Sequence, residues 1–332
     1  MRLFQNSNFD FLRWRWHAVA LSWLIIIAGI VVISTKGLPR GIEFAGGTSV
    51  IAQFDQAASV DSVRQALNTN FPDGGQNAIV QTYGEPSLRQ VMVRVPQVGA
   101  QSGTSLGTIA KAVEDSLRKG SLPPFKIVGT EIVGPSVGDD LTQKGTSAMV
   151  LSLLGILAYI AFRFKFSFAT GAVIATIHDV LVTLAFLAFF QYDITLNVIA
   201  AILTVTGYST NDTIVIFDRV RENMRTMRRE SLNSVINASI NQTLGRTILT
   251  GGLTLLSALA LFVFGGEVLR GFSFTMVVGV ITGTYSSVFV ASAIVTVWGR
   301  GSSSPVAASD EGAAAAAPLP RRLKSPRKAR AS

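Results

Sequence analysis

The stretch Asn197–Asn223, NVIAAILTVTGYSTNDTIVIFDRVREN, decides how the rest of the chain is interpreted. It begins as an apolar helix, and small or polar residues then dominate the segment from Thr204 to Thr213. Inside a membrane span, a carboxylate such as Asp212 costs about 2.5–3.5 kcal/mol unless it faces protein, water or a cation. The stretch is therefore either a poor membrane helix or a functional one.

The composition of the chain indicates an integral membrane protein. Of its 332 residues, 48% are hydrophobic and 15% are charged, and the mean hydropathy is +0.42. Soluble domains carry about 25% charged residues. The net charge of +9 does not indicate nucleic-acid binding, because the basic residues lie beside apolar segments and in the last tail. The chain has no cysteine and only two distant histidines, a composition that does not suggest a metal site.

We predict an α-helical polytopic membrane protein with six transmembrane helices. The first, residues 18–35, follows a basic and aromatic N-terminus (1–17) and is expected to remain as an uncleaved anchor. The other five lie within residues 144–299, at about 146–163, 168–190, 194–217, 245–264 and 271–298. The basic, amphipathic segment 219–243 between two of them is expected to lie along the membrane surface.

Residues 36–143 have the composition of a soluble α+β domain. Strands are predicted at 48–54, 78–83, 88–95 and 125–133, with helices at 59–69, N-capped by Ser59, and at 104–118. The order β-α-β-β-α-β is that of the ferredoxin-like fold. The preceding sequence GIEFAGG (41–47) has neither dinucleotide-binding nor Walker spacing, so we expect it to form a turn or a close backbone contact.

The distribution of charge predicts the orientation in the membrane. Basic residues are concentrated before the first span, between the second and third, between the fourth and fifth, and in the tail from Arg300. The positive-inside rule then places both termini in the cytoplasm and residues 36–143 in the periplasm. The tail, residues 300–332, is rich in Ser, Ala and Pro before becoming basic, and is expected to be disordered.

Three ionisable residues in the predicted spans are candidates for charge coupling: Asp179, Asp212 and Arg246. Polar neighbours that could support them are Tyr208, Asn211, Thr213, Thr247 and Thr250. Simpler explanations remain open, since Arg246 could extend to the membrane surface and Asp179 could be a buried structural group. A carboxylate and a guanidinium in contact could take up a proton on one side and release it on the other, and one charge crossing gains about 2.3 kcal/mol per 100 mV.

Several glycines are positioned for close packing between membrane helices. Gly279 and Gly283 form a G-x-x-x-G sequence, and Gly207, Gly251 and Gly252 provide further small positions.

Three segments of the chain resemble the SecF branch of the SecD/SecF family of bacterial protein-export membrane proteins. They are GIEFAGGTS (41–49), GYSTNDTIVIFDRVREN (207–223) and NQTLGRTILTGGLTLLSALALFVFGG (241–266). The resemblance covers about residues 10–300 and leaves out the basic tail. The resemblance implies a membrane architecture similar to that of resistance–nodulation–division transporters. Six spans with one outer domain also look like half of a twelve-helix pseudo-symmetric transporter.

The resemblance implies an inner-membrane subunit that works with a SecD-like protein at the SecYEG channel. Such subunits use the proton motive force to promote movement of an unfolded polypeptide, so the implied partners are those proteins, the polypeptide and membrane lipid, with no nucleic acid. By position, Asp212 resembles the family's membrane carboxylate and Arg246 its cationic partner, whereas Asp179 matches a third-span acid of less defined role. No enzymatic activity and no cofactor other than protons are implied.

Other functions are compatible with parts of the sequence. Asp179 and Asp212 could form an intramembrane aspartyl protease dyad, but no G-x-G-D sequence precedes the second acid. A small-molecule or lipid transporter of the same superfamily would be expected to carry two large outer domains. A purely structural assembly subunit, without proton coupling, also remains open.

Overall fold

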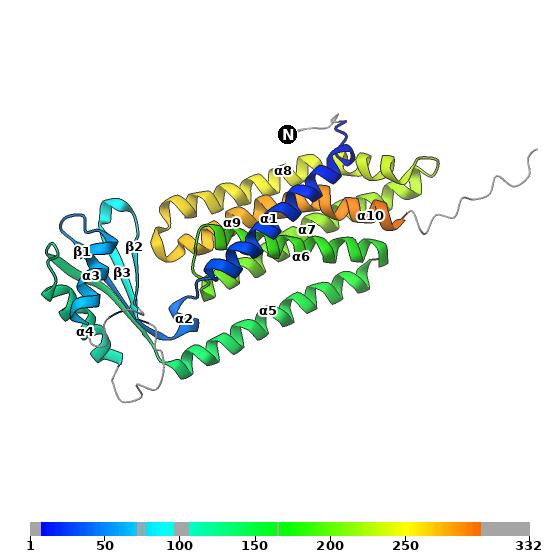
Figure 1. Cartoon of the computed structure of the whole chain (residues 1–332). Coiled ribbons are helices and arrows are strands. Elements are labelled where there is room, and N and C mark those ends of the chain that lie inside the picture. The colour runs from blue at the N-terminus through cyan, green and yellow to red at the C-terminus, as the bar shows by residue number, and fades with distance from the viewer. Residues whose placement is uncertain (1–7, 72–74, 76–77, 96–105, 165, 300–332) are drawn as a thin grey trace, which may run out of the picture.

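The computed structural model describes residues 8–71, 75, 78–95, 106–164 and 166–299, so the predicted tail (300–332) lies outside the described residues. Figure 1 shows a bundle of long helices with a small sheet domain at one end. The chain enters the bundle through a short turn, η1 (Leu12–Trp14), and α1 (Arg15–Lys36). It then crosses into the sheet domain through α2 (Ile42–Ala45).

The sheet domain contains the elements in the order predicted from the sequence. They are β1 (Gly47–Phe54), α3 (Val60–Asn70), β2 (Ile79–Tyr83), a turn η3 (Pro86–Leu88), β3 (Gln90–Val95), α4 (Leu106–Lys119) and β4 (Phe125–Val133). The strands lie in the order β2-β3-β1-β4, and every neighbouring pair is antiparallel.

Local sequence explains how the helices of this domain form and pack on the sheet. The hydroxyl of Ser59 accepts a hydrogen bond from the backbone N–H of Ser62 and so caps α3, as predicted. Val63 and Leu67 of α3, together with Val113 and Leu117 of α4, are completely buried against β1 and β3. The apolar positions of both helices therefore form a single core with one face of the sheet.

The bundle consists of α5 (Pro135–Arg163), α6 (Phe166–Phe189), α7 (Leu196–Thr226), α8 (Leu232–Phe264), α9 (Gly266–Ser286), η4 (Ser287–Ala291) and α10 (Ser292–Gly299). Among the described residues, five helical stretches are long and apolar enough to cross a membrane, and α7 is not one of them. The polar residues in its middle lower its hydropathy. The last predicted span is interrupted by η4, a π-helical turn.

The segment 219–243, predicted to lie along the membrane surface, instead completes two long helices. Helix α7 continues to Thr226 and α8 already begins at Leu232, capped by Ser231. Val220 and Ile236, which gave the segment its amphipathic pattern, are buried in the bundle at 1% exposure each. Their apolar faces are covered by neighbouring helices, so they have no need of a lipid surface.

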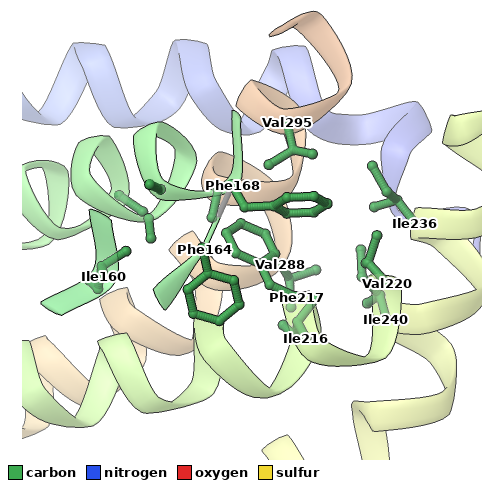
Figure 2. Close-up of a cluster of buried hydrophobic side chains, with 14 of the residues drawn as sticks. Ile160, Phe164, Phe168, Ile216, Phe217, Val220, Ile236, Ile240, Val288 and Val295 are labelled. Carbon is green, nitrogen blue, oxygen red and sulfur yellow. The ribbon is translucent and has the colours of Figure 1, made fainter. Parts of the chain in front are cut away.

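These residues belong to an apolar cluster at the end of the bundle remote from the sheet. Figure 2 shows Phe168 and Phe217 at its centre, with Phe164 and Val288 close by. The rings of Phe168 and Phe217 lie 5.2 Å apart in an edge-to-face arrangement. Such aromatic pairs add about 0.5–1.5 kcal/mol beyond the area they bury. The cluster holds α5, α6, α7, α8 and η4 together at this end.

At the opposite end, backbone contacts attach the sheet domain to the bundle. The N–H of Gly41 donates to the carbonyl of Ile194 (2.7 Å), and the N–H of Ile194 donates to the carbonyl of Pro39 (2.8 Å). A Cβ at Gly41 would lie 2.8 Å from the Ile194 carbonyl, so only glycine allows this approach. Gly47 adopts a φ of 122°. The segment GIEFAGG thus makes a close backbone contact at Gly41, one of the two predicted alternatives, and its middle forms the short helix α2.

A buried ion pair reinforces this attachment. The guanidinium of Arg94 on β3 lies 2.7 Å from the carboxylate of Asp193, and their side chains are only 7% and 19% exposed. Arg94 also donates to the carbonyl of Arg40. Asp193 lies just before α7, whose N-cap is Thr195. The sheet domain is therefore held directly at the beginning of the helix that carries Asp212.

Candidate functional site in the helical bundle

Asp212 lies in the middle of α7 and is only 5% exposed. The hydroxyl of Thr247 on α8 donates a hydrogen bond to its Oδ1 at 2.7 Å. The other carboxylate oxygen, Oδ2, is buried and has no hydrogen-bond partner among the described residues. Asp212 and Thr247 thus form a two-residue contact between the consecutive helices α7 and α8.

Arg246 does not form the ion pair with Asp212 that was predicted from the sequence. Its side chain is exposed, and among the described residues no ion pair includes it, although its charge still acts electrostatically on Asp212. The reason is geometric, because successive residues of an α-helix point about 100° apart. Helix α8 turns Thr247 toward α7, and this orientation directs the neighbouring Arg246 to the outside of the bundle.

The predicted supporting residues fall into different environments. The Tyr208 hydroxyl, one turn before Asp212, is buried without a hydrogen-bond partner in the described part of the chain, and a Cβ at Gly251 would lie 3.1 Å from it. Thr213 shares a hydrogen bond of 2.7 Å with Ser287 of η4. Thr250 donates to the backbone of its own helix, and Asn211 is exposed.

Asp179 of α6 forms a separate polar cluster and is 1% exposed. Its Oδ2 accepts hydrogen bonds from the hydroxyls of Ser209 on α7 (2.5 Å) and Ser286 on α9 (2.8 Å). Its Oδ1 lies 2.9 Å from Nδ1 of His178. Both carboxylate oxygens of Asp179 therefore have a polar partner, whereas only one of those of Asp212 does. Asp179 links three helices.

Ser209, Ser286 and Ser287 belong to this region but were not predicted from the sequence as site residues. Ser209 was visible only as one of several small polar residues before Asp212, and the serine pair 286–287 lies in a span that looks otherwise ordinary. The π-helical turn begins at Ser287, whose carbonyl accepts a hydrogen bond from the Ser292 hydroxyl. Such turns are frequent at functional sites.

The predicted packing glycines divide into two groups. A Cβ at Gly279 would lie 2.3 Å from Val205, and one at Gly283 would lie 2.7 Å from Ser209, so both glycines allow α9 to approach α7 closely. Gly251 provides room for the Tyr208 hydroxyl. At Gly207 and Gly252 a Cβ would meet no described atom within 4 Å, so the predicted close approach is absent at these two positions.

Comparison with known proteins shows which family has this architecture. A family model described as "Protein export membrane protein SecD/SecF, C-terminal" matches residues 112–301, and one described as "SecD/SecF GG Motif" matches residues 31–58. Protein translocase subunit SecF from Escherichia coli O157:H7 is 42% identical over 288 residues, which cover 86% of this chain and 86% of the relative. The chain belongs to the SecD/SecF family.

A second relative agrees in length, and a solved structure agrees in fold over most of this chain. Protein translocase subunit SecF from Vibrio alginolyticus is 42% identical over 290 residues, covering 87% of this chain and 89% of the relative. The crystal structure of SecDF, a translocon-associated membrane protein from Thermus thermophilus, superposes with a TM-score of 0.78 at 32% identity. The match covers 90% of this chain but only 40% of the SecDF chain.

Proposed function

We propose that this chain is a SecF-type subunit that works with a SecD-like protein to promote proton-motive-force-driven polypeptide translocation at a SecYEG channel. Its family and the names of its relatives support this function. The observation that carries the proposal is Asp212, a carboxylic acid buried between membrane helices with one oxygen on Thr247 and the other without a partner among the described residues.

The contact with Thr247 suits a group that gains and loses a proton. A hydroxyl can donate to a carboxylate or accept from a carboxylic acid, so rotation of the Thr247 O–H serves both states. The open position at Oδ2 leaves room for the proton without breaking an existing hydrogen bond. Each proton that crosses provides about 2.3 kcal/mol per 100 mV. Protons are the coupling ion in this proposal, and no nucleotide, metal or covalent chemistry is involved.

Asp179 has a different role in the same proposal. Its oxygens are engaged by His178, Ser209 and Ser286, which come from three helices. We assign it to holding α6 against α7 and α9 while Asp212 titrates.

The proposed topology has six spans, with α7 as the fourth. At 31 residues α7 is long enough to cross a bilayer of about 30 Å. Figure 1 shows the α5–α6 and α7–α8 connections at the end remote from the sheet domain, and the sequence there is basic. This end is assigned to the cytoplasm of a bacterial inner membrane, and the ferredoxin-like sheet domain to the periplasm.

Cysteine labelling tests this topology. The chain contains no cysteine of its own, so only an introduced cysteine can react. Asp61→Cys on the sheet domain should react with a membrane-impermeant maleimide added to intact spheroplasts. Glu230→Cys, between α7 and α8, should react only after permeabilisation. The reverse pattern would contradict the assigned orientation.

A SecD-like partner is proposed to cover the exposed polar face of α7. Thr204, Gly207 and Asn211 follow helical spacing and are all exposed, although they lie within the proposed span. Small and polar residues in a span typically face another helix. Gly207 and Gly252 both have open surroundings, but only Gly207 lies on this polar face of α7. Gly207→Leu should lower co-purification with a SecD-like protein, whereas Gly252→Leu should not.

Potential-dependent export in membrane vesicles tests the function. Asp212→Asn should abolish stimulation by the proton motive force, and Arg246→Met should reduce it. Thr247→Val should also reduce it, whereas the matched Thr250→Val should not, since the Thr250 hydroxyl bonds only within its own helix. Unchanged export in both Asp212→Asn and Arg246→Met would indicate a structural assembly subunit instead.

A further inference from the structure

An apolar groove runs along the bundle where α1, α6 and α10 meet. It has a volume of about 560 Å³, within the usual range for small-ligand sites. Its walls include Trp16, Val19, Trp23, Ile177, Val297 and Trp298. Its size and lining suit a hydrocarbon chain.

The polar residues along the groove are turned toward the protein. The hydroxyl of Ser22 donates to the hydroxyl of Tyr285 at 3.3 Å. Nδ1 of His178 lies 2.9 Å from Asp179, inside the bundle. The groove therefore offers mainly hydrocarbon and indole surface, which a water-soluble ligand would not fill.

One end of the groove carries a positive charge. Arg15 precedes Val19 by one helical turn, and Val19 continues along the same face to Ser22 and Ile26, which line the groove. Nη1 of Arg15 donates to the hydroxyl of Thr296 at 3.1 Å, next to a residue of the opposite wall. The guanidinium carbon lies 5.6 Å from the centre of the Trp16 ring. Arg15 is thus held beside one end of the groove by residues in or next to the lining.

The charge of Arg15 lacks an acidic partner among the described residues. At the same end of the bundle, Arg163 and Arg221 pair with Asp218, and Arg219 pairs with Glu222. No ion pair between described residues includes Arg15, and its Nε is buried without a hydrogen-bond partner there. This site therefore retains uncompensated positive charge.

We propose that the groove binds one acyl chain of an anionic phospholipid, with the lipid phosphate on Arg15. Tryptophans concentrate at the level of lipid headgroups, and Trp16 and Trp298 flank the charged end. Basic pockets between membrane helices bind anionic headgroups on the cytoplasmic side. The inference depends on the membrane placement of these helices and not on proton coupling, so the export measurements can fail without affecting it.

Lipid binding to the full-length chain tests the proposal. The purified, delipidated protein is titrated with phosphatidylglycerol or with phosphatidylethanolamine of the same acyl chains, and bound lipid is counted by native mass spectrometry. Phosphatidylglycerol should bind more tightly. Arg15→Gln should weaken its binding about fivefold, the effect of one basic residue beside a headgroup. It should weaken phosphatidylethanolamine binding less, because the ammonium of that headgroup compensates the phosphate charge.

Two further variants separate the groove from general lipid contact. Arg13→Gln removes an exposed charge near the same end and should change phosphatidylglycerol binding by less than about twofold. Val297→Phe narrows the groove at a residue that is 54% exposed, so the bundle should keep its unfolding temperature while both lipids bind more weakly.

Several outcomes would overturn the proposal. Equal affinity of the wild-type chain for both lipids would show surface contact only, as would equal effects of Arg15→Gln and Arg13→Gln. Unchanged lipid binding in Val297→Phe, with the protein folded, would place the lipid outside the groove. Loss of bound lipid on addition of the SecD-like partner would assign the groove to a partner helix.

Discussion

Replacing Arg94 by methionine should loosen the attachment of the sheet domain to the helical bundle. Arg94 is the buried member of the ion pair with Asp193, and it also donates to the carbonyl of Arg40. Methionine keeps most of the apolar stem but removes the charge and the donors. Asp193 would then remain at the domain boundary without its cation.

The size of the effect follows from burial. Removing one partner of a fully buried pair costs about 3–5 kcal/mol. The Asp193 side chain is 19% exposed and would recover some hydration, so we expect about 2–3 kcal/mol for local opening. A difference of that size corresponds to roughly 30- to 150-fold in the opening equilibrium.

Hydrogen-exchange mass spectrometry measures this opening directly. The N–H groups of Gly41 and Ile194 make the backbone bonds between the two parts, so their exchange should accelerate by that factor in Arg94→Met. Lys144→Met, which breaks an exposed ion pair with Asp140, is the matched control and should change exchange at these amides by less than about twofold. Equal protection of Gly41 and Ile194 in the wild type and in Arg94→Met would refute the reasoning.

Three further predictions concern stability. Gly279→Ala should lower the thermal unfolding midpoint, because its Cβ would lie 2.3 Å from Val205 and overpacking costs about 1–3 kcal/mol. Gly252→Ala places its Cβ in open space and should be neutral or stabilising. Equal shifts of the unfolding midpoint in the two variants would contradict the close packing at Gly279. Burial raises the pKa of Glu43. The resulting contribution of Glu43 to the free energy of unfolding is therefore fully present below the ordinary glutamate pKa, and it is lost as the pH rises through the raised pKa. In denaturation curves measured at increasing pH, Glu43→Gln should therefore become more stable relative to the wild type. A stability difference between the two proteins that does not change with pH would argue against this reasoning. Asp179→Leu leaves the buried Ser209 hydroxyl and His178 Nδ1 without Asp179, while Ser286 keeps its bond to the Gly283 carbonyl, and should destabilise the fold by several kcal/mol. Asp179→Asn keeps one acceptor oxygen and should destabilise it less. Thermal unfolding that ranks the two variants in the opposite order would contradict the role of Asp179 in linking three helices.

Features that depend on short stretches of chain could be predicted well. Ser59 caps a helix through a bond to a residue three positions later, so the sequence alone was enough to find it. The order of strands and helices followed from periodicity and turn residues in the same way. The burial of segment 219–243 inside the bundle was not predictable, because its apolar face is covered by helices distant in the sequence.

The sequence by itself determined that an acid at position 212 interrupts an apolar helix and needs an explanation, because residue type and hydropathy are local properties. Only the tertiary structure decided that Thr247 rather than Arg246 contacts Asp212, and that Ser209 and Ser286 surround Asp179. The rotation of a helix about its axis sets which of two adjacent side chains faces inward. That rotation is fixed by packing, for example where Gly279 and Gly283 bring α9 against α7, and no single segment encodes it.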